Sequence, residues 1–209
     1  MGRKKHIKIR EVVELRNVFV APAEMKGKWR EFFGGGEIIL ELACGHGYYT
    51  LALAEKFPRQ NFIGIDKKGD RIWEGATKSA EVKNAAFVRC LIEKLEDYFE
   101  EGEVSEIWIT FPDPYPKPSK ARKRLTAKRF LEIYQRVLKP GGVLHLKTDN
   151  EALFDYSIDS LSDFGAEILK INRDVHEKPT KLLAIRTFYE NKFLAEGKKI
   201  KYLMARFLA

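Results

Sequence analysis

The sequence predicts a single α/β domain in which a mostly parallel sheet of seven strands carries helices on both faces. Short apolar runs alternate along the chain with longer segments of helical periodicity, and this alternation requires crossover connections between parallel strands. The 209 residues fit one domain, and a hydrophobic fraction of 44% is enough to bury a core.

Each predicted element follows from a local pattern. Residues 38–42 form a short apolar run typical of a buried parallel strand, and the helical pattern after it ends at Pro58. The KPGG turn at 139–142 separates a helix from the fifth strand. The strands are predicted at 38–42, 61–65, 85–89, 105–111, 142–148, 165–171 and 198–207, and the helices at 48–57, 70–82, 91–99, 126–138, 150–162 and 188–195. Residues 1–16 are predicted to be a basic N-terminal arm, and residues 17–209 the folded domain.

The composition excludes several classes of protein. No run approaches the roughly 18–20 consecutive apolar residues that span a membrane, and no apolar stretch follows the basic first ten residues as a secretory signal requires. Two isolated cysteines exclude a disulfide framework, and no CxxC or HxxxH spacing indicates a metal site. We therefore expect a cytoplasmic protein with no membrane contact.

The positive charge is concentrated in two segments without acids. The net charge is +8, with five cations in residues 1–10 and seven in residues 114–131. The rest of the chain has 26 cations against 30 acids. Ordinary solvated surface charge explains one such run, whereas two of them favour a polyanionic partner whose phosphates they neutralise.

The first predicted strand ends in a glycine turn, ELACGHG at 41–47. Glycines allow a tight turn and close approach of a ligand to the backbone, but the GxGxxG dinucleotide motif needs a third glycine where Thr50 stands. S-adenosylmethionine has no phosphates, and its cationic sulfonium and amine suit Glu41 beside the turn. Asp66, at the end of the second strand, is placed to accept its ribose hydroxyls. The alternatives are an ordinary βα turn and, for Asp66, a helix N-cap.

A proline-rich loop, FPDPYPKP at 111–118, follows the fourth predicted strand. Its prolines fix φ at about −65° and hold the segment extended. Asp113 is therefore expected on a rigid segment at the carboxyl end of the fourth strand. Tyr115 can stack on a base, and the cationic run continues directly from the loop. A plain turn is the alternative, but it does not account for the coupling to seven cations.

These motifs resemble those of the tRNA (guanine-N7)-methyltransferases of the bacterial single-chain type. The resemblance covers residues 17–207 and is most specific in the PDP loop and its basic tail; further matches are ExxxGxG at 41–47, KTD at 147–149 and TFYE at 187–190. It implies a Rossmann-like class I methyltransferase fold, S-adenosylmethionine as donor and guanine-46 of the tRNA variable loop as acceptor. It also implies a monomer or homodimer that requires no partner subunit.

The resemblance assigns roles by position. Donor binding falls on Glu41, Gly45, Gly47, Asp66, Cys90 and Asp113, and Asp113 is also the catalytic residue. Guanine or tRNA binding falls on Lys117, Asp149, Thr187, Phe188, Tyr189 and Glu190, and contact with the tRNA backbone on Lys120, Arg122, Lys123 and Arg124.

The sequence departs from the family pattern at several positions. Asp66 stands where many members have Glu, Tyr115 replaces a usual Trp, and Cys90 stands where many have Asp or Asn. Pro118, Ser119 and Ala121 dilute the basic tail. Two assigned segments also have structural alternatives, because Asp149 could cap the next helix and TFYE has the T-x-x-E pattern of a capping box.

The implied reaction needs alignment more than acid–base chemistry, since guanine N7 already carries a lone pair. A methyltransferase for an exocyclic amine is one rival, but such enzymes carry DPPY-type loops and this chain has DPYP at 113–116. A non-catalytic RNA-binding module is the other rival. The intact set Glu41, Gly45, Gly47, Asp66 and Asp113 argues against it.

Overall fold

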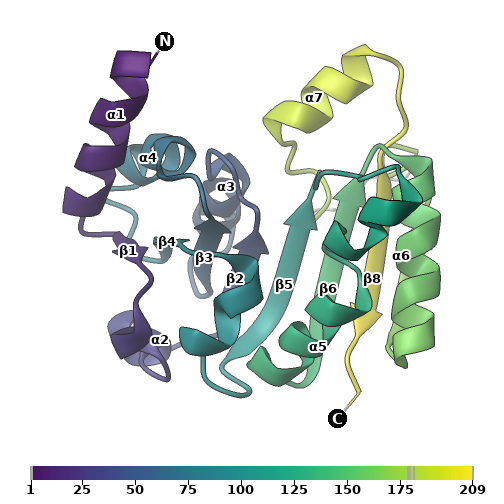
Figure 1. Cartoon of the computed structure of the whole chain (residues 1–209), viewed down its shortest axis with the longest axis horizontal. Coiled ribbons are helices and arrows are strands. Elements are labelled where there is room, and N and C mark those ends of the chain that lie inside the picture. The colour runs from purple at the N-terminus through teal and green to yellow at the C-terminus, as the bar shows by residue number, and fades with distance from the viewer. Residues whose placement is uncertain (1, 178–179, 181, 209) are drawn as a thin grey trace.

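Eight strands of the described residues form one sheet in the order β1-β4-β3-β2-β5-β6-β8-β7 (Figure 1). This computed structural model describes residues 2–177, 180 and 182–208, without the side chains of Arg3 and Phe188. The strands are β1 (Val18–Val20), β2 (Ile38–Leu42), β3 (Asn61–Asp66), β4 (Ala85–Arg89), β5 (Val104–Thr110), β6 (Leu138–Thr148), β7 (Glu167–Asn172) and β8 (Lys201–Arg206). The first six in sequence pair in parallel, and β8 runs antiparallel to both neighbours.

The prediction of seven strands was wrong by one, because β1 adds an eighth at the sheet edge. This strand has only three residues, and it pairs in parallel with β4, with Val18 opposite Phe87. Three residues are too short for an alternating or continuous apolar pattern. The strand is defined by its pairing with a segment almost seventy residues away, which the local sequence does not contain.

The predicted helices are present, with one change of type. The α-helices are α1 (Gly2–Glu11), α2 (Trp29–Phe32), α3 (Tyr48–Lys56), α4 (Gly69–Lys78), α5 (Lys128–Val137), α6 (Glu151–Phe164) and α7 (Phe188–Ala195), and the 3-10 helices are η1 (Val12–Glu14), η2 (Ala23–Met25), η3 (Ile92–Asp97) and η4 (Pro118–Lys123). The helix predicted at 91–99 is the 3-10 segment η3, which is interrupted at Lys94 by non-helical backbone angles. No helix among the described residues has the length and apolarity to cross a membrane.

Apolar side chains fill both faces of the sheet, as the alternation along β2 shows. Leu40 and Leu42 are fully buried in the cluster that includes the apolar face of α5, whereas Ile39 belongs to the opposite cluster with residues of α3 and α4. A strand with both faces buried has a continuous apolar sequence, which is the pattern that predicted it.

The N-terminal segment packs against the domain. Helix α1 lies beside α4 (Figure 1), and Lys8 on α1 forms an ion pair of 2.8 Å with Glu74 on α4. Tyr48, at the start of α3, donates a hydrogen bond to the other oxygen of the same carboxylate. Val12 is fully buried. The basic arm therefore includes a docked helix next to the glycine turn.

Helix α7 lies above the carboxyl ends of β5 and β6 (Figure 1). A buried ion pair attaches it there, because Lys147 near the end of β6 and Glu190 in the first turn of α7 have no exposed side-chain surface and lie 2.5 Å apart. His176 lies 3.0 Å from the second oxygen of Glu190, and Lys147 also donates to the carbonyl of Ile185. The connection between β7 and β8 is thus fixed to β6 by charge and hydrogen bonding.

Replacing Lys147 by Met is expected to destabilise the protein by about 3–5 kcal/mol, because it leaves the Glu190 carboxylate buried without its partner. The double variant Lys147→Met/Glu190→Gln should cost less than the two single substitutions together. Urea unfolding of the four proteins measures this coupling.

A matched control is Lys139→Met, which removes a lysine from an exposed ion pair with Glu37 at 2.8 Å. This substitution should cost less than about 1 kcal/mol. Strictly additive costs at Lys147 and Glu190 would show that the buried pair does not hold α7.

Candidate active site

The glycine turn after β2 lies at the point where the strand order reverses, between β2 and β5, which is where open parallel sheets bind ligands. Gly45 and Gly47 both have positive φ, +57° and +71°. A Cβ at Gly47 would collide with the ring of Phe87, whereas nothing lies within 4 Å of a Cβ position at Gly45. Packing therefore requires the second glycine, and the first leaves its backbone open to a ligand.

Asp66 closes the turn from the end of β3. It is 7% exposed, and its carboxylate accepts hydrogen bonds from the backbone N–H of Gly45 at 3.0 Å and of Lys68 at 2.8 Å. It makes no capping hydrogen bond to α4, whose N-cap is Lys68. The helix-cap alternative is thus wrong, and Asp66 instead fixes the turn with its carboxylate at the strand ends.

Glu41 joins three elements beneath the turn. Its side chain on β2 is 3% exposed, and Oε2 accepts hydrogen bonds from the backbone N–H of Thr50, at 2.9 Å, and from the Thr50 hydroxyl. Oε1 accepts a hydrogen bond of 2.7 Å from the hydroxyl of Thr110 at the end of β5. Burial raises the pKa of Glu41 to about 7, against the opposing effect of these hydrogen bonds.

Cys90 follows β4 at the same edge. It is 7% exposed, and its backbone N–H donates to the carbonyl of Asp66 at 3.2 Å. Burial raises the pKa of its thiol to about 12, so it is a neutral group beside the turn.

The proline loop, residues 111–117, leaves the end of β5 with unusual backbone geometry. Phe111 and Tyr115 have φ of +49° and +43°, in the left-handed region that non-glycine residues rarely adopt. The N–H of Phe111 donates to the carbonyl of Lys147 on β6, and its ring lies 5.7 Å from that of Phe193 on α7. Asp113 is exposed, and none of the described residues donates a hydrogen bond to it.

The cations that follow the loop differ in their surroundings. Lys117, Lys120, Arg122 and Lys123 are exposed. Arg124 is half-buried, and it donates to the carbonyls of Pro114 and Tyr115 at 3.2 and 3.1 Å. Its guanidinium carbon also lies 4.3 Å from the centroid of the Tyr156 ring on α6. Of the four residues predicted to contact the tRNA backbone, Lys120, Arg122 and Lys123 are exposed to solvent, and Arg124 is hydrogen-bonded within the protein.

Asp149 follows β6, and its side chain is 18% exposed. It forms an ion pair with Lys198 at 3.2 Å. The capping alternative for this residue is wrong, because the neighbouring Asn150 caps α6 by accepting from the N–H of Leu153 at 2.8 Å. Asp149 keeps its carboxylate at the site edge.

The segment Thr187–Glu190 does cap a helix. The Thr187 hydroxyl accepts from the N–H of Glu190 at 2.9 Å, as the T-x-x-E pattern predicts. The Glu190 carboxylate points to Lys147 and is fully buried. Tyr189 is 44% exposed, and Phe188 starts α7 with its side chain outside the described residues.

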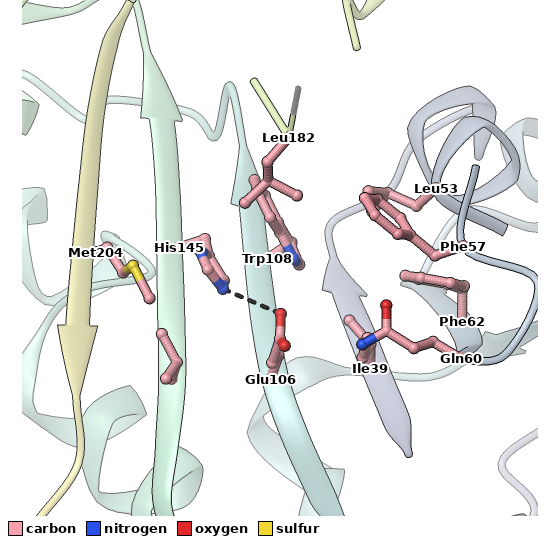
Figure 2. A pocket seen from close by; sticks show the side chains of 11 residues that line it. Ile39, Leu53, Phe57, Gln60, Phe62, Glu106, Trp108, His145, Leu182 and Met204 are labelled. Atoms are coloured by element: carbon pink, nitrogen blue, oxygen red, sulfur yellow. Dashed lines mark hydrogen bonds and ion pairs between the residues drawn. The ribbon is translucent and has the colours of Figure 1, made fainter. Parts of the chain in front are cut away.

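A separate cavity of about 390 Å³ lies on the α3 side of the sheet (Figure 2). Trp108 and His145 form part of its wall, with their rings stacked 4.1 Å apart, and His145 lies 3.1 Å from the carboxylate of Glu106. None of the residues that line it belongs to the predicted site. The cavity sits at the middle of the strands rather than at their carboxyl ends.

The structure thus gathers the predicted acids and glycines at the carboxyl ends of the parallel strands, with the proline loop and α7 above them. Sequence reasoning missed three groups that support them: Thr50 and Thr110, which bind Glu41, and Lys147, which binds Glu190. Lys147 was visible in the KTD motif. Its position at the end of an apolar run, in a strand predicted to be buried, was the signal that its charge would need a buried partner.

Replacing Glu41 by Gln tests its raised pKa. The unfolded carboxyl ionises near pH 4.5 and the folded one near pH 7, so wild-type stability from this group is complete below about pH 4.5 and is lost as the pH rises to about 7. Relative to Glu41→Gln, the wild type should lose about 3 kcal/mol of unfolding free energy between pH 4 and pH 8. Guanidinium unfolding at both pH values measures the difference. An equal difference at the two pH values would contradict the assignment.

Comparisons with known proteins place the chain in one family. Residues 36–203 match the family model described as "Putative methyltransferase". The tRNA (guanine-N(7)-)-methyltransferase of Cytophaga hutchinsonii is 42% identical, with 100% of this chain and 99% of that protein covered. The protein of the same name from Christiangramia forsetii is 47% identical over 90% of this chain and 85% of its own length.

Solved structures show the same fold at low identity. The 16S rRNA methyltransferase KamB superposes with a TM-score of 0.66 at 13% identity, covering 86% of this chain and 91% of that one. A 16S rRNA (adenine(1408)-N(1))-methyltransferase from Catenulisporales acidiphilia, solved with S-adenosylmethionine, gives 0.64 at 16% identity, covering 88% and 91%. With its fold, its glycine turn and these relatives, the chain belongs to the tRNA (guanine-N7)-methyltransferase family of S-adenosylmethionine-dependent enzymes.

Proposed function

We propose that this protein transfers a methyl group from S-adenosylmethionine to N7 of guanine-46 in the tRNA variable loop. The observation that carries the proposal is the position of the proline loop. It places an exposed Asp113 at the sheet edge that holds the glycine turn, and exposed cations continue directly from it. The membership of the chain in the family supports the same reaction.

The residues at the glycine turn fit a methyl donor. The backbone at Gly45 is open, and the acids Glu41 and Asp66 lie beneath and beside it. Asp66 would hold the ribose hydroxyls, Cys90 would border the adenine, and Glu41 would favour the cationic end. When bound, the donor supplies an activated methyl group on a positively charged sulfur.

The proposed catalysis is alignment with electrostatic stabilisation. Because N7 of guanine already has a lone pair, no residue must first remove a proton, and in-line positioning supplies most of the rate. Positive charge passes to the purine during transfer. A carboxylate fixed near the line of transfer stabilises that charge, and we assign this role to Asp113.

We assign guanine recognition to Asp149 rather than Glu190. A guanine edge offers the N1–H and the 2-amino group, which need an acceptor that the base can reach. Asp149 keeps 18% of its side chain exposed at the carboxyl end of β6, whereas the Glu190 carboxylate is fully buried between Lys147 and His176. Helix α7 then contributes through its exposed Tyr189 and through its position over the edge.

Incubation of the protein with a tRNA transcript and the donor should produce N7-methylguanine at one variable-loop position. In Asp113→Asn, the single-turnover rate should fall by at least about 10²-fold with folding intact, because one preorganised charge is lost. Chemical mapping of N7-methylguanine gives the position, and quenched-flow sampling gives the rate.

A transcript with adenine at position 46 is the control for the site, and it should remain unmodified. Methylation of that transcript at another guanine would overturn the proposed position. A near-normal rate in Asp113→Asn would remove Asp113 from catalysis.

Replacing Lys120, Arg122 and Lys123 by Ala should weaken tRNA binding and flatten its salt dependence. Each lost phosphate contact lowers the slope of log affinity against log salt by about 0.7–0.9, so the slope should fall by about 2–3. Donor affinity should not change, because the glycine turn is untouched. Fluorescence titration with tRNA at several salt concentrations measures the slope.

The charge-matched control is Arg136→Ala/Lys139→Ala/Arg206→Ala, three exposed cations near the amino ends of the parallel strands. This variant carries the same net charge as the test variant but should keep the wild-type slope. Equal slopes in the two triple variants would assign the effect to overall charge rather than to the loop.

A further inference from the structure

Three of the seven residues of the proline loop have no backbone N–H to donate. Residues 112, 114 and 116 are prolines, and a proline has no N–H to donate. At these three positions the backbone can form hydrogen bonds only through its carbonyl oxygens, and this requires donors from elsewhere. Because Phe111 and Tyr115 have positive φ, the surrounding contacts must also hold the loop in a conformation that it would otherwise leave.

Arg124 supplies those donors. In the described part of the chain, it is the one residue whose side chain forms hydrogen bonds to the backbone of residues 112–116, with Nε at 3.2 Å from the Pro114 carbonyl and Nη2 at 3.1 Å from the Tyr115 carbonyl. The planar guanidinium presents several N–H groups in a fixed fork, which suits two successive carbonyls.

The guanidinium is also held from behind. Its carbon lies 4.3 Å from the centroid of the Tyr156 ring, so one face of the group is covered by α6. A guanidinium that stacks on an aromatic ring and donates two hydrogen bonds within the protein is held in place by the protein itself. This separates Arg124 from the exposed Arg122 and Lys123 that precede it.

We infer that Arg124 is a positioning residue that fixes the proline loop to α6 and thereby sets the orientation of Asp113. This inference rests on the proposed role of Asp113. Pro114, whose carbonyl Arg124 binds, directly follows Asp113, and no described residue donates a hydrogen bond to the Asp113 carboxylate itself. The aim of that carboxylate therefore depends on the loop, and the loop depends on the guanidinium.

The test is Arg124→Lys, which keeps the charge but loses the fork and most of the stacking. At saturating tRNA and donor, its single-turnover rate should fall about 10- to 100-fold, the scale of a small misplacement of a reacting group. Its tRNA affinity, donor affinity and salt slope should stay at wild-type values. Rate and affinity then separate, which general destabilisation does not produce.

Arg206→Lys is the matched control, because it makes the same substitution at an exposed arginine near the amino ends of the parallel strands, away from the proline loop, and it should keep the wild-type rate. Arg124→Ala should lose rate like Arg124→Lys, with the salt slope unchanged. If Arg124 is instead a phosphate contact, Arg124→Ala lowers the slope by about 0.7–0.9 and Arg124→Lys keeps its rate. That outcome overturns the inference.

Tyr156→Leu guards against a folding defect at Arg124, because it removes the ring behind the guanidinium and leaves the arginine in place. A reduced rate with unchanged tRNA affinity is expected, and a wild-type rate counts against the inference. The wild-type protein distinguishes the two levels of the argument. If it forms no N7-methylguanine, the proposed function fails; if it does so and Arg124→Lys equals it, only the inference fails.

Discussion

The buried carboxyl group of Glu41 holds together the parts from which the site is built. It connects β2, the first turn of α3 and the end of β5 through hydrogen bonds from Thr50 and Thr110. The glycine turn lies between Glu41 and Thr50 along the chain, and Asp66 at the end of β3 fixes it by accepting a hydrogen bond from Gly45. Because burial raises the pKa of Glu41 to about 7, a cationic ligand beside it favours the carboxylate form near neutral pH. Structural support and the proposed donor binding therefore depend on the same group.

The cations that follow the proline loop differ in their surroundings. Exposed lysines and arginines keep their charge in water, and they can neutralise phosphates at little structural cost. Arg124 differs from them, because it donates hydrogen bonds to the proline loop and one face of its guanidinium packs on Tyr156. A loop whose prolines cannot donate needs such a group. The run thus combines exposed cations, which we propose contact the tRNA, with one arginine that is held within the protein.

The sequence predicted the features that local patterns determine. Short apolar runs in the alternating order located the first five predicted strands, and the last two were predicted beyond the point where that order breaks down. The order of strand and helix placed Glu41, Asp66, Asp113 and Asp149 at the carboxyl ends of the parallel strands. It did not predict contacts between distant segments. Lys147 and Glu190 are 43 residues apart, and Arg124 has the same residue type as its exposed neighbour Arg122. In such cases packing decides between a buried partner and a solvated charge.

Helix α7 shows how one short motif can satisfy two constraints. Thr187 supplies the backbone cap, while the carboxylate three residues later turns inward to Lys147. Phe193 on the same helix packs on Phe111, and the N–H of Phe111 binds the carbonyl of Lys147. The proline loop is consequently held on one side by β6 and α7 and on the other by Arg124 and α6. Asp113 lies on the stretch between these two supports, so its position depends on both.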